Sequence, residues 1–289
     1  MNAEVLGPQT LGELVGTYLA TQCTVIVEAE EPLRAGHNVI HPTRVAVRRL
    51  RSTLRVFSEL FELPRASRLD EELRWYAAVL GEIRDLDVME RRLNAQLDAL
   101  PDEVVLGPVR STLAEVVAGR RHGARQALLE AMDSERYRAL VDLLLQWRER
   151  PPYTADAERP AKRAGRYIKR ADRRVSRRLV PAYAAAQAGQ PEAGELLHAA
   201  RKAGKRHRYA VEAAEPIWGS KATAIVERRK DFQELLGDHH DTVVAAAFLR
   251  ELAASTGSAA GHNGFTWGVL YAIELADAEK TLAKVKDFL

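Results

Sequence analysis

Cysteine is almost absent from this chain of 289 residues, and its scarcity is a first constraint on the fold. The single cysteine, Cys23, excludes any disulfide within the chain, so a packed core must hold the structure together. Cys23 lies in the apolar run 23–27, which is typical of a buried and unreactive thiol. Hydrophobic residues make up 46% of the sequence, which is enough to build a core.

Long apolar stretches and a basic leader are missing as well. No apolar run approaches the roughly 20 residues of a membrane-spanning helix. The first four residues, Met1 to Glu4, lack the positive charge that opens a secretory signal peptide. We therefore expect a soluble, cytoplasmic protein without a membrane partner.

The chain also has little net charge, because 43 basic residues are nearly balanced by 40 acidic ones to leave +3. An excess of positive charge therefore cannot by itself attract a polyanion. Any such binding must depend on where the basic residues lie.

Strand patterns with a period of two are nearly absent, and helix-forming residues dominate. The sequence predicts an all-α protein of about ten helices. Ser134 followed by Glu135 indicates one helix start, since serine caps free amide groups. Prolines and glycines divide the predicted helices at 9–34, 42–62, 66–98, 103–131, 135–149, 157–187, 192–214, 221–237, 239–256 and 262–288.

Two sequence motifs occur twice. Residues 41–51 align with 198–208 at an offset of 157, and residues 80–85 align with 236–241 at an offset of 156. Two separate matches at nearly one offset indicate an internal duplication. We expect two antiparallel helical bundles, at 1–150 and 157–289, related by a pseudo-twofold axis.

The first copy carries a one-sided basic row, and no acidic residue lies between positions 41 and 55 to neutralise it. Spacings of three and four residues place the row on one helical face, beside an apolar stripe. From the first to the last arginine the row spans about 16 Å. Its members are His41, Arg44, Arg48, Arg51 and Arg55.

The second copy repeats this row with His198, Arg201, Lys205 and Arg208, and Lys202 lies alongside. A third basic segment, 162–178, has nine basic residues and one acid. Within it, Arg166, Arg170, Arg173 and Arg177 fall on one face. A single charged run is usually a solvated face, whereas three arginine-rich rows favour a polyanion site. We expect all three rows to converge on one groove.

Arginine presents a planar fork of donors that suits phosphate oxygens. Proteins that bind single-stranded nucleic acid interleave aromatic residues with their basic ones, and these rows have only Tyr167 and Tyr209 nearby. No duplex-recognition motif is present either. A ligand made only of phosphate fits better, and nucleic acid is an unlikely partner.

The motifs themselves resemble a known family. The first reads His41-x-x-Arg44-Val45-Ala46-x-Arg48-Arg49-Leu50-Arg51, and the second reads Leu80-Gly81-x-x-Arg84-Asp85-x-Asp87-Val88. Together with 134–137 and 197–209, they resemble the CHAD domain, the conserved histidine α-helical domain. The resemblance implies an all-helical, duplicated fold that binds inorganic polyphosphate through a basic surface. It also implies association with polyphosphate granules or with a triphosphatase-type enzyme.

By position, the resemblance implicates these residues in ligand binding: His41, Arg44, Arg48, Arg51, His198, Arg201, Lys202, Lys205 and Arg208. Arg49 and Arg84, which lie in the same motifs, are further candidate binding residues. His207 departs from the apolar residue expected at its place. In the second copy His240 replaces Arg84, which weakens the case for a symmetric role there.

The residues leave two other function classes open, a polyphosphate-processing enzyme and a sequence-independent nucleic-acid binder. No phosphate-binding loop, paired catalytic carboxylates or Ser/Cys nucleophile motif appears, so we expect neither enzyme activity nor a cofactor. His239-His240-Asp241 could suggest a metal site, but adjacent helical residues point about 100° apart. A helix start there is the better interpretation. We expect Asp85 to support an arginine of the basic row and Asp87 to be structural.

Overall fold

The computed structural model describes residues 7–256 and 264–288, and this part of the chain is built from helices without any strand. The prediction of an all-α fold is confirmed. Short 3-10 turns join the α-helices, which are α1 Leu11–Glu28, α2 Glu30–Arg34, α3 Ile40–Val56, α4 Leu63–Ala99, α5 Val109–Asp133, α6 Glu135–Glu149, α7 Ala164–Gln187, α8 Ala193–Ala213, α9 Glu215–Trp218, α10 Ser220–Thr256 and α11 Phe265–Lys284.

Several predicted helices have different bounds in the structure, among them 42–62, whose helix α3 ends at Val56, and 157–187, whose helix α7 begins at Ala164. The segment 9–34 is broken at Ala29 into α1 and α2, and the segment 103–131 begins only at Val109. Gly107 precedes this start with a φ of 79°, a conformation that a helix cannot contain. The predicted cap is confirmed, since the amide of Tyr137 donates to Ser134 Oγ over 3.2 Å.

The predicted break between 237 and 239 is wrong, because α10 runs without interruption through both positions. His239 and His240 therefore lie in the middle of a helix and not at its start. An interior glycine costs only about 1 kcal/mol relative to alanine. Burial of Phe232, Leu236 and Ala245 on the same helix outweighs that cost.

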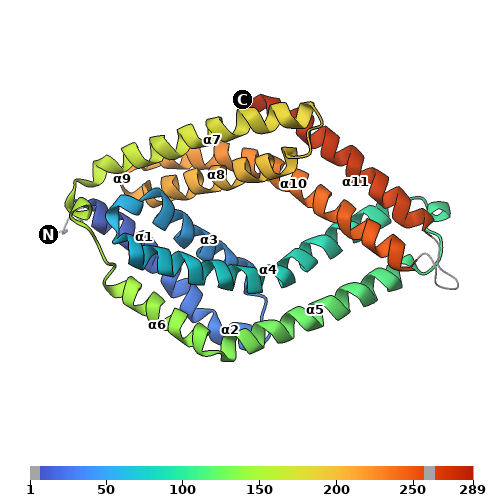
Figure 1. Cartoon of the computed structure of the whole chain (residues 1–289), viewed down its shortest axis with the longest axis horizontal. Helices are drawn as coiled ribbons and strands as arrows, with labels where there is room; N and C mark the ends of the chain where they lie inside the picture. The colour runs from blue at the N-terminus through green and yellow to red at the C-terminus, as the bar shows by residue number, and fades with distance from the viewer. Residues whose placement is uncertain (1–6, 257–263, 289) are drawn as a thin grey trace.

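The helices pack around three cores (Figure 1). The largest joins α1, α3, α6 and the first part of α4, and it contains Cys23, which is fully buried as predicted. A second core joins the far half of α4 with α5, α10 and α11, and includes Leu93 and Trp267. The third lies between α7, α8 and α10.

The long helices α4 and α10, each of 37 residues, connect these cores and extend side by side with α5 and α11 respectively (Figure 1). Between the cores, polar residues of α4 lie beside α3, and polar residues of α10 lie beside α8. The helices α3 and α8 contact each other. This arrangement positions the site described next. No described helix has the length and apolar character needed to cross a membrane.

Candidate functional site: a basic cleft between α3 and α8

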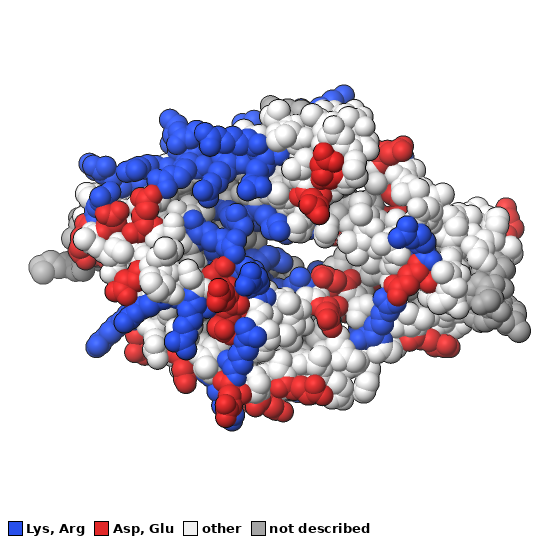
Figure 2. All heavy atoms as spheres, in the orientation of Figure 1, with Lys and Arg blue, Asp and Glu red and all other residues white. Residues whose placement is uncertain are grey.

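A cavity of about 520 Å³ lies where α3, α4, α8 and α10 meet. Seven cationic side chains line it, against two carboxylates. Eight of the predicted site residues are among its walls: His41, Arg44, Arg48, Arg84, His198, Arg201, Lys202 and Lys205. The structure thus brings together the basic rows of α3 and α8. Figure 2 shows basic side chains gathered around a hollow at the centre of this face.

Arg44 is held in place by α4. Its Nη1 donates to the carbonyl oxygen of Gly81 over 2.7 Å and to Asp85 Oδ1 over 3.0 Å. A Cβ at position 81 would stand 3.7 Å from Arg44 Nη2, so the glycine leaves just enough room for the guanidinium. The predicted role of Asp85 as a support for an arginine of the row is confirmed.

Arg201 of α8 lies against α10 in a similar way. A Cβ at Gly237 would be 3.4 Å from Arg201 Nη2, and among the carboxylates Asp241 has the largest favourable effect on the Arg201 charge. Burial nevertheless lowers the pKa of Arg201. The Nε atoms of Arg48 and Arg201 are both buried, and neither has a hydrogen-bond partner within the described residues. Unsatisfied buried donors are costly, so these two atoms favour an acceptor that enters from the cavity.

Lys205 is a half-buried member of this cluster. Burial lowers its pKa to about 7, and the neighbouring charges of Arg201 and Arg48 act in the same direction. Burial also lowers the pKa of His198 to about 4, with Lys202 and His240 adding to the shift. The rings of His198 and His240 are 5.2 Å apart, and both histidines are neutral at pH 7.

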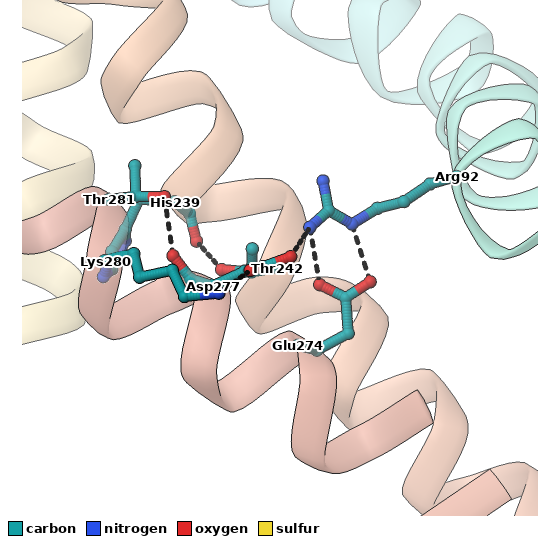
Figure 3. A network of polar contacts seen from close by, with 7 residues as sticks. All are labelled: Arg92, His239, Thr242, Glu274, Asp277, Lys280 and Thr281. Carbon is teal, nitrogen blue, oxygen red and sulfur yellow. Dashed lines mark hydrogen bonds and ion pairs between the residues drawn. The ribbon is translucent and has the colours of Figure 1, made fainter. Parts of the chain in front are cut away.

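The central cavity is also lined by a cation that was not predicted from the sequence, Arg92. Arg92 of α4 lines the cavity and reaches across to α11, where Nε and Nη2 pair with the two carboxylate oxygens of Glu274 at 2.6 and 2.7 Å (Figure 3). Glu274 is fully buried. Arg92 follows Arg84 and Val88 at intervals of four residues, a signal that could have extended the motif along α4.

A smaller cavity of about 430 Å³ adjoins the first and shares Arg48, Lys202 and Lys205 with it. It holds the predicted residues Arg51 and Arg55, which both pair with Asp70 at 3.0 and 2.6 Å. Its remaining lining residues are Ser52, Arg74, Arg206 and Tyr209. We call the two cavities together the basic cleft.

Arg206 is surrounded by other cationic side chains. Burial lowers its pKa to about 10, and Arg55, Arg178 and Arg174 add to the effect. Arg206 was not among the candidate site residues predicted from the sequence. Arg174 and Arg178 come from α7, so this helix does contribute charge beside the cleft.

Arg49 and Arg208 line neither cavity. Both turn toward Glu212, with Nε–Oε distances of 2.9 and 3.3 Å, and the hydroxyl of Tyr18 donates to the same carboxylate over 3.0 Å. Arg208 also lies over the ring of Tyr209. These contacts stabilise the junction of α1, α3 and α8, and they leave both arginines away from the cavity.

The face of α7 formed by Arg166, Arg170 and Arg173 does not line the cleft either. Arg166 and Arg173 are exposed, and Arg170 pairs with Glu59 at 2.6 Å. Because α7 buries Ala171, Val175 and Leu179 against its neighbours, other positions approach α8. Arg174, Arg177 and Arg178 line a small cavity together with Leu196 and Ala199 of α8. Figure 2 shows the resulting band of basic residues over α7.

No group of three or more histidine, cysteine or acidic side chains in the described part of the chain is arranged to hold a metal ion. His240 and Asp241 line the central cavity instead. Asp87, the other acid singled out by the motif, pairs with Arg121 of α5 at 3.3 Å.

A family model, described as the CHAD domain, matches residues 17–250. The chain belongs to the CHAD domain family. Two solved structures share its fold. The CHAD domain of the plant Ricinus communis has a TM-score of 0.69 and 27% identity, covering 98% of this chain and 96% of that one. PptA from Streptomyces chartreusis has a TM-score of 0.79 and 21% identity, covering 97% and 99%.

Two proteins of Mycobacterium tuberculosis, from strains CDC 1551 / Oshkosh and H37Rv, are similar in sequence and are described as uncharacterized. Each is 34% identical over 278 residues, which is 95% of this chain and 52% of the relative. This CHAD chain therefore spans about half the length of these curated relatives.

Proposed function

We propose that the basic cleft binds inorganic polyphosphate. The observation that carries this proposal is the meeting of two basic rows, from α3 and α8, around donors that have no partner in the described protein. Burial and, after it, the charges of neighbouring cations lower the pKa of Lys205 and of Arg206, and a polyanion would relieve the repulsion among these cations. Free energy stored as unfavourable charge crowding becomes binding free energy when the ligand neutralises it.

The lining residues favour a chain of phosphates over a nucleic acid. Among the described residues, no Phe, Tyr or Trp lines the central cavity, and Tyr209 alone lines the smaller one. Proteins that hold single strands rely on several aromatic platforms. Arginine and lysine, in contrast, donate charge-assisted hydrogen bonds to phosphate, which is the only chemical group in polyphosphate.

We propose binding and not catalysis. Both carboxylates of the central cavity face arginines, since Asp85 pairs with Arg44, and Asp241 lies beside Arg201. Carboxylates with these partners support the basic residues. Association with polyphosphate granules or with a triphosphatase-type enzyme follows from the family resemblance as a further expectation.

We also infer that the chain consists of two duplicated halves, at 1–150 and 157–289, related by a pseudo-twofold axis. Three structural features support this. The helices α4 and α10 have the same length of 37 residues. Each carries a glycine against which an arginine of the preceding basic helix lies, Gly81 with Arg44 and Gly237 with Arg201. Each also pairs with the helix that follows it, α5 or α11.

Calorimetric titration with a polyphosphate of defined length tests the proposal. Replacing both Arg48 and Lys205 with alanine should weaken binding about a hundredfold or more, because each lost charge-assisted contact costs about 1.5–3 kcal/mol. The matched control replaces Arg65 and Arg110, two exposed arginines outside both cavities, and should bind like the parent. Equal affinity of all three proteins would overturn the proposed site.

Two further measurements distinguish polyphosphate binding from the two other function classes, an enzyme and a nucleic-acid binder. Phosphate release from polyphosphate, measured with and without divalent metal, should stay at the background rate, and a turnover lost in the Arg48/Lys205 variant would instead identify an enzyme. DNA or RNA added at matched salt should compete poorly. If nucleic acid displaced polyphosphate at equal phosphate concentration, a general polyanion binder would be the better description.

A further inference from the structure

A separate cavity of about 560 Å³ opens between α7, α8, α10 and the C-terminal turn Val285–Phe288. It shares no lining residue with either cavity of the basic cleft. Its walls combine apolar side chains with a small polar group, whereas the cleft is dominated by cations. This mixture is typical of sites that hold small organic molecules.

The polar group is centred on His207, which is only 4% exposed. In the predicted repeat, the corresponding position of the first half is Leu50, which is fully buried in the core. A polar ring at a core position is costly unless its nitrogens are satisfied. Arg229 supplies one contact, since its Nε donates to His207 Nδ1 over 3.2 Å, and its Nη2 pairs with Asp172.

These contacts determine which nitrogen of His207 carries the proton. Burial lowers its pKa to about 4, and the charge of Arg229 acts in the same direction, so the ring is neutral at pH 7. Because Nδ1 accepts from Arg229, the proton is on Nε2. Nε2 lies 3.7 Å from the Asp172 carboxylate, beyond hydrogen-bond distance, and it remains a donor for a ligand. A ring in this state is suited to binding and is a poor base.

The remaining lining residues complete the site. Arg228 is exposed at the rim, and within the described residues no ion pair is recorded for it. Arg229, in contrast, is already neutralised by Asp172. Ser176 is a further polar lining residue, and the apolar part of the wall consists of Val175, Leu179, Ala224, Ile225 and Phe288.

We propose that this cavity is a second ligand site, which binds a small organic anion with an apolar body, such as an aromatic carboxylate. Its anionic group would meet Nε2–H of His207 and the guanidinium of Arg228, while the body packs against Val175, Leu179 and Phe288. Inorganic polyphosphate has no apolar part and gains nothing from these walls. The two sites therefore select different ligand classes.

The test titrates the full chain with 2-naphthoate and, separately, with its uncharged amide. We expect saturable binding of the carboxylate and at least about tenfold weaker binding of the amide, because the amide cannot form the charge-assisted contacts. Arg228→Glu should weaken the carboxylate about tenfold or more. Lys230→Glu is the matched control, since Lys230 lies on the same helix, outside this cavity, and the change in net charge is the same.

A second variant addresses the buried ring. His207→Leu introduces the residue that the first half carries, so it should keep the melting temperature while weakening 2-naphthoate. The proposal is overturned if 2-naphthoate does not bind, or if Arg228→Glu and Lys230→Glu weaken it equally. It is also overturned if saturating polyphosphate displaces 2-naphthoate fully, since that would place the compound in the basic cleft.

Discussion

Arg92 of α4 and Glu274 of α11 form a bidentate ion pair, with distances of 2.6 and 2.7 Å (Figure 3). The pair joins the wall of the basic cleft that α4 forms to helix α11. Glu274 is fully buried, and Asp277 lies 3.9 Å from the same guanidinium. This pair supplements the second core, through which α4 and α5 pack on α10 and α11. It therefore helps to fix the distance between α4 and α11 beside the cleft.

Removing one member of this pair should destabilise the fold strongly. We expect Arg92→Ala to lower the free energy of unfolding by about 3–5 kcal/mol, because it leaves a buried carboxylate without a counter-charge. Replacing both residues, as Arg92→Met with Glu274→Leu, should cost much less. Urea denaturation measures both variants. Loss of the exposed Arg110–Asp98 pair serves as control and should change little. Equal losses in the single and double variants would contradict this account.

Polyphosphate affinity should fall as pH rises through 7. Burial lowers the pKa of Lys205 to about 7 in the free protein, so the amine loses its charge near neutrality. Burial lowers the pKa of His198 to about 4, so this neighbouring ring is neutral between pH 6 and 9 and does not add to the change. A bound polyanion favours the charged amine and should be accompanied by proton uptake.

Calorimetry in buffers of different ionisation enthalpy measures this uptake. In Lys205→Met, both the proton uptake and the loss of affinity between pH 6 and 9 should disappear. Stability should show the opposite trend in the parent protein. The folded pKa lies below the unfolded one, so the unfolded chain binds more protons, and stability rises from about pH 7 toward the unfolded value near 10.4.

Salt should weaken binding to the cleft steeply. Each phosphate neutralised by a protein releases counterions, and for nucleic acids the log–log slope is about −0.9 per phosphate on duplexes and −0.7 on single strands. For polyphosphate we expect the same direction. Removing Arg48 and Lys205 should make the slope shallower, whereas removing Arg65 and Arg110 should not. Affinity that is independent of salt would indicate a small ligand held in a pocket.

The sequence was sufficient to predict the helical fold and the central part of the cleft, because both follow from local spacing. Arg44 and Arg48 share a face of α3, and no tertiary information is needed to see it. The partner of Arg92 was not predictable in this way, since Glu274 lies 182 residues away on a different helix. No spacing rule links residues across that separation.

Some residues that were predicted to bind the ligand do not line the cleft, and the reason is again a tertiary contact. Arg208 follows Lys205 at helical spacing, yet the carboxylate of Glu212, one turn further, turns it toward Tyr209. Arg173 and Arg174 are adjacent in a basic stretch, and only the packing of α7 on α8 decides that Arg174 approaches Arg206 beside the cleft. Periodicity identifies the faces of a helix, but burial of one face against a neighbour decides what the other faces can reach.

Gly204 offers a test of how closely the second basic row depends on the packing of α8 against α10. A Cβ at this position would stand 2.7 Å from the ring of Phe232, which is fully buried. Gly204→Ala should therefore force the two helices apart and cost about 1–3 kcal/mol of stability, although alanine is the better helix former. Because Arg201 and Lys205 flank this position, polyphosphate affinity should fall as well.

Gly119→Ala is the matched control, since Gly119 lies exposed within α5 with nothing within 4 Å of the added carbon, and it should stabilise the protein by about 0.5–1 kcal/mol. Thermal unfolding measures the stability of both variants, and titration measures their affinity for polyphosphate. If Gly204→Ala changed both quantities as Gly119→Ala does, close contact between α8 and α10 would not position the basic row of α8.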